Sequence, residues 1–155
     1  MRVGTPAAAA AAQTRLLGLP ELARARTVAV YSAIGDEVPV EPVAEACRAR
    51  GVRVVYPVVV GPELELTADP ARAERVPVAE VDVFVVPALR FDRAGRRLGR
   101  GGGHYDRLLA RRRVDAWLVG ICYEDRVTDE LPEDPWDVRM HVIVADRFLL
   151  RVAAP

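Results

Sequence analysis

The 155-residue sequence contains no lysine, so all 22 of its basic residues are arginine. A coding bias toward GC-rich codons is the simplest origin of this composition. The chemical consequence holds whatever the origin. The missing amine excludes Schiff-base chemistry and a phosphate-binding loop of the kind that depends on lysine.

Cysteine is scarce, and neither sign of charge is in excess. Cys47 and Cys122 lie far apart with no partner motif, which favours free thiols in a reducing cytoplasm over a disulfide or a metal site. The 22 acidic residues balance the 22 basic ones. The net charge therefore provides no general attraction to nucleic acid or to a membrane surface.

Long apolar runs are also missing. No stretch is long enough to cross a membrane, and the alanine run at 7–12 lacks the basic flank and apolar centre of a signal peptide. At 51% hydrophobic and 28% charged residues, the composition is that of a globular protein. We expect a single domain over 1–155 that is cytoplasmic and monomeric and has no nucleic-acid or membrane partner.

Helix-like and strand-like segments alternate along the chain. The predicted helices cover 7 to about 17, 40–51 and 105–113, and the predicted strands cover 27–33, 52–60, 81–89, 116–123 and 141–146, with a short edge strand at 63–66. Strand 81–89 is apolar at both odd and even positions, as a strand covered on both faces requires. The sequence predicts an α/β, three-layer Rossmann-like fold, with a mainly parallel sheet covered by helices on both faces.

The segment RLGRGGGHYDRLL (97–109) places four of the chain's eleven glycines within five positions, between a predicted strand and a predicted helix. Glycines let the backbone approach a ligand closely, and N–H groups before a helix can bind an anion. The alternative is a plain flexible turn. The spacing matches neither a phosphate-binding loop with lysine nor a dinucleotide-binding fingerprint.

Charge is divided unevenly around this loop. Residues 90–113 hold nine arginines and two aspartates, whereas residues 121–137 hold seven acids and one arginine. A single predicted strand separates the two segments, so both adjoin the same sheet. The arrangement suits a polyphosphate with a divalent cation, because arginines bind phosphate and carboxylates hold the metal. The alternative is a solvated surface with ordinary ion pairs.

Three segments resemble the 5-formyltetrahydrofolate cyclo-ligase family. Residues 81–109 contain its Phe-Asp pair, followed by a loop close to Leu-Gly-x-Gly-Gly-Gly-Tyr-Tyr-Asp-Arg, in which His104 replaces the first tyrosine. Residues 27–38 are similar to its strand and Gly-Glu-Val turn, and residues 119–138 to its closing segment. The resemblance covers about residues 12–147.

The resemblance implies a reaction that uses ATP to close a ring. The formyl oxygen of 5-formyltetrahydrofolate attacks the γ-phosphate, N10 then attacks the formyl carbon, and loss of phosphate gives 5,10-methenyltetrahydrofolate. The protein's task in such a reaction is to align the groups and to neutralise charge. ATP as co-substrate, Mg²⁺ and a reduced folate are the implied small molecules.

The resemblance also implies roles for individual residues. Catalysis is assigned to Arg100, His104 and Tyr105, and magnesium to Asp106 and Asp137. ATP binding is assigned to Arg97, Gly99, Arg100, Gly101, Gly102, Gly103, His104 and Tyr105. Binding of the folate is assigned to Glu37, Gly101, Gly102, Gly103, His104 and Tyr105.

Other interpretations remain open at this point. His104 can be an aromatic spacer, Asp106 a helix cap, and His141 either a metal ligand facing Asp137 or a half-buried strand residue. Trp136 is expected to be a packing residue.

Two other functions stay open beside the cyclo-ligase reaction. This sequence shows neither the family's Lys-x-x-x-Arg helix before residue 16 nor its Gly-Ile-x-Glu-Pro segment. A shortened homologue that binds nucleotide or folate without efficient catalysis is therefore one alternative. A phosphosugar- or coenzyme-A-binding protein is another.

Overall fold

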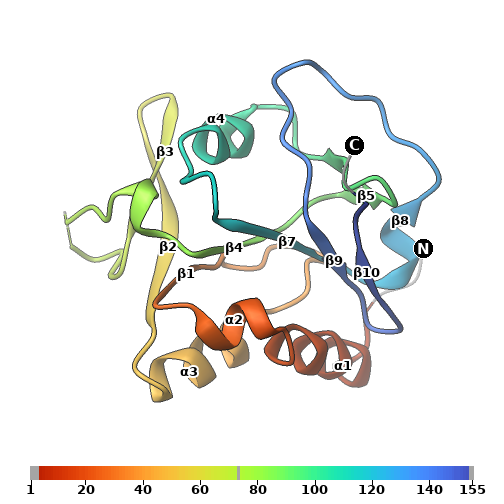
Figure 1. Ribbon diagram of the computed structural model, residues 1–155, viewed down its shortest axis with the longest axis horizontal. Helices are drawn as coiled ribbons and strands as arrows, with labels where there is room; N and C mark the ends of the chain where they lie inside the picture. Colours follow the sequence, from red (N-terminus) through yellow and green to blue (C-terminus); the bar gives the residue numbers. More distant parts are fainter. Residues whose placement is uncertain (1–3, 73, 154–155) are drawn as a thin grey trace.

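The computed structural model describes residues 4–72 and 74–153. Its main sheet has seven strands in the order β10-β9-β7-β4-β1-β2-β3 (Figure 1). The strands are β1 (Thr27–Ala29), β2 (Arg53–Val60), β3 (Glu63–Thr67), β4 (Val83–Val86), β7 (Trp117–Ile121), β9 (Val142–Val144) and β10 (Leu149–Arg151). The five central strands are parallel, and β3 and β10 join the two edges in antiparallel orientation.

Helices cover both faces of this sheet. On one face lie α1 (Pro6–Leu17), α2 (Pro20–Arg24) and α3 (Glu41–Ala49), and on the other lies α4 (His104–Ala110) (Figure 1). On β4, Val83 and Val85 pack in the apolar cluster beneath the first three helices. Phe84 and Val86 pack in the cluster on the opposite face. The predicted mainly parallel sheet with helices on both faces is confirmed.

Local signals in the sequence explain where the helices begin and end. Thr5 caps α1, because its hydroxyl accepts a hydrogen bond from the N–H of Ala8 at 3.0 Å, and Pro6 takes the first helical position. Beyond α3, Gly51 adopts φ +81°, the left-handed conformation that commonly ends a helix.

The predicted strands are longer than the paired segments. The prediction over 27–33 reduces to Thr27–Ala29, and 141–146 reduces to Val142–Val144. Strand β10, which follows the last of the predicted strands at 141–146, was not predicted. A three-residue strand is too short to show the alternation by which strands are recognised.

A small second sheet, also missing from the prediction, lies beside the main one. It has the order β6-β5-β8, formed by β5 (Arg90–Asp92), β6 (Arg97–Leu98) and β8 (Val127–Thr128). Two 3-10 turns, η1 (Val78–Glu80) and η2 (Glu124–Arg126), complete the structure. Phe91 of β5 packs against Gly120 of β7, where a Cβ would lie 2.5 Å from the Phe91 ring. The second sheet therefore covers part of the face that carries α4.

The β2–β3 hairpin extends past the sheet and is held by α4. Strand β2 pairs with β1 from Arg53 as far as Val55. Further along β2, Pro57 has no N–H with which to continue this ladder. Arg107 donates to the Pro62 carbonyl at 2.8 Å, and Arg111 donates to the Leu64 carbonyl at 2.6 Å.

Within the residues described, no helix is long and apolar enough to cross a membrane.

Candidate active site

A cleft of about 270 Å³ opens where β1, β4 and β7 end. After β1 the chain continues to β2 on one side, and it later returns to form β4 on the other side of β1. Parallel sheets bind their ligands at such switch points, outside the carboxyl ends of the strands. The cleft is lined by Gly35, Asp36, Glu37, Val38, Ala88, Leu89, Arg100, Ile121, Cys122, Tyr123 and Arg126.

Two ion pairs cross this cleft from the loop after β1. Glu37 Oε2 lies 3.4 Å from Arg100 Nη2, and Glu37 Oε1 accepts a hydrogen bond from the N–H of Ile34 at 3.0 Å. The Glu37 side chain is only 9% exposed. Asp36 pairs with Arg126 of η2. Glu37, the carboxylate predicted to bind folate, and Arg100, an arginine predicted to bind phosphate, therefore lie in direct contact.

Glycine is required in the loop that leads to α4. Gly103, the residue before the helix, has φ +68°, a left-handed conformation that other residues rarely adopt. A Cβ on Gly102 would lie 2.6 Å from Nδ1 of His104. The glycine run therefore sets the path of the backbone between Arg100 and His104.

Arg97 lies under this loop rather than in the cleft. Its side chain is 7% exposed, and its guanidinium carbon lies 5.2 Å from the centre of the Tyr105 ring. One Nη donates to the Pro87 carbonyl at 3.2 Å, and the other lies 3.9 Å from Asp106. Burial lowers the pKa of Arg97, but the negative charge of Asp106 opposes this shift, and the guanidinium stays cationic.

Tyr105 carries a neutral phenol in this environment. Burial raises the pKa of its phenol well above the usual value; the Arg97 cation opposes this shift, and the Glu37 carboxylate adds to it. The same effects of burial and of Glu37 raise the pKa of Tyr31, whose hydroxyl donates to the Val38 carbonyl at 2.6 Å. Both phenols therefore keep their protons at neutral pH.

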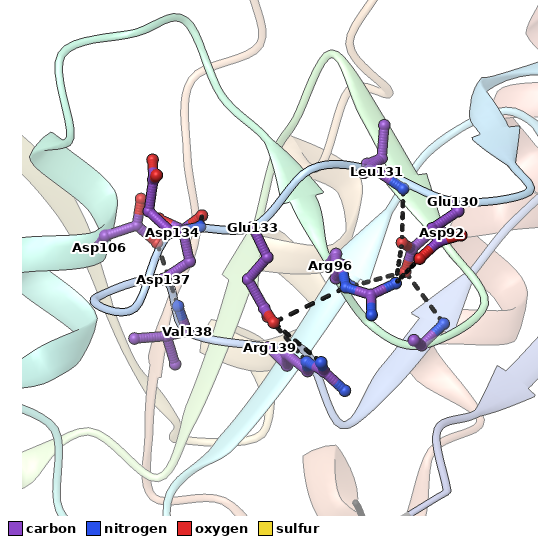
Figure 2. A network of polar contacts seen from close by, with 11 residues as sticks. Asp92, Arg96, Asp106, Glu130, Leu131, Glu133, Asp134, Asp137, Val138 and Arg139 are labelled. Atoms are coloured by element: carbon purple, nitrogen blue, oxygen red, sulfur yellow. Dashed lines mark hydrogen bonds and ion pairs between the residues drawn. The ribbon is translucent and has the colours of Figure 1, made fainter.

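Asp106 and Asp137 lie close together (Figure 2), and the charge of each acts on Arg97. Asp106 Oδ1 accepts from the N–H of Val138 at 3.4 Å, and Asp137 Oδ2 accepts from the N–H of Asp134 at 2.8 Å. No group of three acidic, histidine or cysteine side chains in the described part of the chain forms a metal site. Mg²⁺ commonly uses only one or two carboxylates together with water and phosphate oxygens, so this oxygen donor pair fits it.

The predicted residues thus fall into two groups joined by the glycine loop. Glu37 and Arg100 line the cleft, whereas Arg97, Tyr105 and Asp106 form a partly buried cluster beside it. Tyr123, which the sequence places at the end of a strand as either a cleft or a packing residue, lines the cleft. Cys122 and Arg126 also line it and were not predicted. The position of Cys122 directly after strand β7 was the available signal.

Cys47 and Cys122 are free and buried, and burial raises the pKa of Cys122 to about 12. Nδ1 of His141 accepts the N–H of Leu118 at 2.9 Å, which favours the half-buried strand role for this histidine. The expectation that Trp136 is a packing residue is wrong, because its side chain is 66% exposed beside Asp137.

Comparison with known proteins gives a consistent result. The profile of the 5-formyltetrahydrofolate cyclo-ligase family matches residues 62–146. A 5-formyltetrahydrofolate cyclo-ligase of Escherichia coli strain K12 is 29% identical over 154 residues, covering 86% of this chain and 85% of that protein. The protein of the same name in Mycoplasma pneumoniae is 32% identical over 122 residues, covering 78% and 73%.

The fold agrees with these relatives. The NMR structure of Aquifex aeolicus 5,10-methenyltetrahydrofolate synthetase matches 95% of this chain and 82% of its own, with a TM-score of 0.81 and 32% identity. The profile match spans more than half of the chain and includes β4, the glycine loop and α4. The chain therefore belongs to the 5-formyltetrahydrofolate cyclo-ligase family.

Proposed function

We propose that this protein is an ATP-dependent 5-formyltetrahydrofolate cyclo-ligase. The formyl oxygen attacks the γ-phosphate of ATP and ADP leaves; N10 then attacks the formyl carbon, and phosphate departs with the former formyl oxygen. The products are 5,10-methenyltetrahydrofolate, ADP and phosphate. The observation that carries the proposal is the contact between Glu37 and Arg100 in a cleft at the switch point of the sheet.

The size of the cleft supports a division of labour between its two sides. At about 270 Å³ it falls just below the range of pockets that enclose a drug-sized molecule, so it can enclose one part of the two substrates. Glu37 provides an acceptor for the N–H groups of the folate's pterin ring. Arg100, with the main-chain N–H groups of 99–103, provides donors for the phosphates.

The two cationic side chains differ in what they can do. Arg100 is half-exposed and can swing onto a phosphate, whereas Arg97 is enclosed between Tyr105 and Asp106. Arg97 therefore contributes a fixed positive charge behind the glycine loop. Tyr105 keeps its proton and acts as a donor rather than as a base.

Asp106 and Asp137 are the residues that would hold Mg²⁺, with the phosphates as further ligands. When bound, the cation would neutralise charge on the phosphate oxygens. When no cation is bound, the nearby Arg97 limits the repulsion between the two carboxylates, because its positive charge interacts with both of them.

The reaction can be followed by the near-ultraviolet absorbance of the methenyl product. We expect product from 5-formyltetrahydrofolate only when both ATP and Mg²⁺ are added. Arg100→Gln is expected to lower kcat/KM by about 100-fold. Arg72→Gln is the matched control, because Arg72 makes an exposed ion pair with Asp69 and does not line the cleft. Binding of ATP without any product would support the non-catalytic alternative.

A further inference from the structure

Asp92, at the end of β5, is a fully buried carboxylate without a direct role in the proposed reaction. Its Oδ1 accepts from the N–H of Ala94 at 3.0 Å and of Arg96 at 2.9 Å. Its Oδ2 accepts from the N–H of Leu131 at 2.9 Å and from the Arg96 guanidinium at 3.1 Å. Burial opposes ionisation, but these donors outweigh it and lower the pKa of Asp92, so it stays charged.

The turn that Asp92 organises, residues 92–96, holds the acidic loop, residues 131–140, at two points. The first point is at Leu131, where the loop begins and whose N–H donates to Asp92. The loop returns at Met140, whose N–H donates to the Gly95 carbonyl at 2.8 Å. Leu131 and Met140 are both buried. The loop from 131 to 140 therefore has both of its ends fixed to one turn.

Arg96 extends this attachment along the loop (Figure 2). Its Nε lies 3.7 Å from Glu133, and Glu133 in turn forms two contacts with Arg139, at 2.7 and 2.8 Å. The pairs with Glu133 join the outgoing and returning halves of the loop. Between them, Val138 contacts Asp106, and the neighbouring Asp137 bonds to Asp134.

We propose that Asp92 is a positioning residue for catalysis: through the 92–96 turn and Arg96, it holds the acidic loop so that Asp137 stays beside Asp106. This inference rests on the proposed function, because it concerns the carboxylates assigned to Mg²⁺. A loop without this attachment would have to be ordered when Mg-ATP binds, and that ordering would weaken the affinity.

The test compares wild-type protein with Asp92→Asn, which keeps the size of the side chain but removes its charge and an acceptor. Hydrogen exchange at the Val138 amide, measured without metal or nucleotide, is expected to become at least about tenfold faster, because the loop opens more often. Calorimetry with Mg²⁺ and a non-hydrolysable ATP analogue is expected to show about tenfold weaker binding. In turnover, the KM for Mg-ATP should rise more than kcat falls.

Asp82→Asn provides a matched control. Asp82 also accepts two backbone N–H groups, those of Arg26 and Thr27, and it also binds an arginine, Arg113. It lies outside both the cleft and the acidic loop. We expect Asp82→Asn to destabilise the fold. The ratio of the hydrogen-exchange rate of the Val138 amide to that of the Leu118 amide, a reference in strand β7, should not change, and neither should the affinity for Mg-ATP.

Unchanged Val138 exchange in Asp92→Asn, or the same loss of affinity in Asp82→Asn, would overturn the positioning role. Failure of wild-type protein to bind Mg-ATP would instead overturn the proposed function on which it rests. If Asp92→Asn does not fold, Arg96→Gln replaces it. That variant retains the Asp92 bonds to Ala94 and Leu131 but cuts the link to Glu133, and it is expected to show the same faster exchange and weaker binding.

Discussion

At the scale of single residues, Gly95 limits what the 92–96 turn can accept. It has φ +84°, and a Cβ there would lie 2.4 Å from the Met140 carbonyl oxygen. Gly95→Ala therefore combines backbone strain with a clash against the end of the acidic loop. We expect it to lower the free energy of unfolding by more than the 1–2 kcal/mol, roughly, that a left-handed conformation alone costs, as measured by urea denaturation.

Gly51→Ala separates these two effects. Gly51 also has a positive φ, +81°, but no atom lies within 4 Å of the position that its Cβ would take. It should cost about 1 kcal/mol of backbone strain and no more. Equal losses in the two variants would show that the contact between Gly95 and Met140 adds nothing.

His141 makes stability depend on pH. Burial, and to a lesser extent the Arg112 charge, lower the pKa of its imidazole, which accepts the Leu118 N–H in the neutral form. Below about pH 6.5 the His141 imidazole takes up a proton in the unfolded chain but resists protonation in the folded chain. The stability of the fold therefore decreases as the pH is lowered. We expect urea denaturation at pH 8 and pH 5.5 to show this loss in wild type and a smaller one in His141→Gln. An identical pH dependence in both proteins would contradict the assignment.

The sequence predicts roles for Glu37, Arg100 and Asp106 by their motif, but it does not predict the surroundings of these side chains. Whether an arginine of the glycine segment enters the cleft depends on packing: Arg100 does, and Arg97 stacks on Tyr105 instead. Asp92 is part of the matched Phe-Asp pair, yet its partner Leu131 lies 39 positions along the chain. Long-range hydrogen bonds of this kind leave no local pattern.

At the scale of elements, α4 and the β2–β3 hairpin hold each other through arginine. The hydrogen bond from Arg111 to the Leu64 carbonyl is 2.6 Å long and partly buried. Arg111→Ala is expected to lower the free energy of unfolding by about 1–2 kcal/mol in chemical denaturation. Arg72→Ala, which removes an exposed pair with Asp69, should change it by at most about 0.5 kcal/mol. Similar effects would show that the contact between α4 and the hairpin is not special.

The elements that lie in long apolar or periodic segments were predictable, and several short strands were not. Helix α1 and strand β2 carry strong periodic or apolar patterns over eight or more residues. Strands β5, β6, β8 and β10 have two or three residues each, and pairing with distant segments defines them. The second sheet depends on the fit of Phe91 over Gly120, which becomes visible only after the main sheet has formed.

At the scale of the whole molecule, the order of the strands creates the site. The chain leaves β1 for one half of the sheet and returns to β4 in the other half, so Glu37 and Arg100, 63 positions apart, come into contact. In the free protein Glu37 and Arg100 are engaged with each other in an ion pair. Phosphate binding to Arg100 should therefore release Glu37 for the folate, and by linkage folate binding should favour ATP.

This coupling can be measured. A reduced folate is expected to bind about fivefold more tightly in the presence of Mg²⁺ and a non-hydrolysable ATP analogue than in their absence. Arg100→Gln should abolish the difference, because Glu37 is then free in both states. Equal folate affinities with and without the nucleotide in wild-type protein would contradict the coupling.

The central claim is that the glycine loop and the Asp106 carboxylate together bind magnesium-loaded nucleotide. Calorimetric titration of wild-type protein and Asp106→Asn with Mg²⁺ and a non-hydrolysable ATP analogue tests it most directly. We predict saturable heat for wild type and binding that is at least about tenfold weaker for the variant. An absence of heat in wild type, or the same affinity in both proteins, would contradict it.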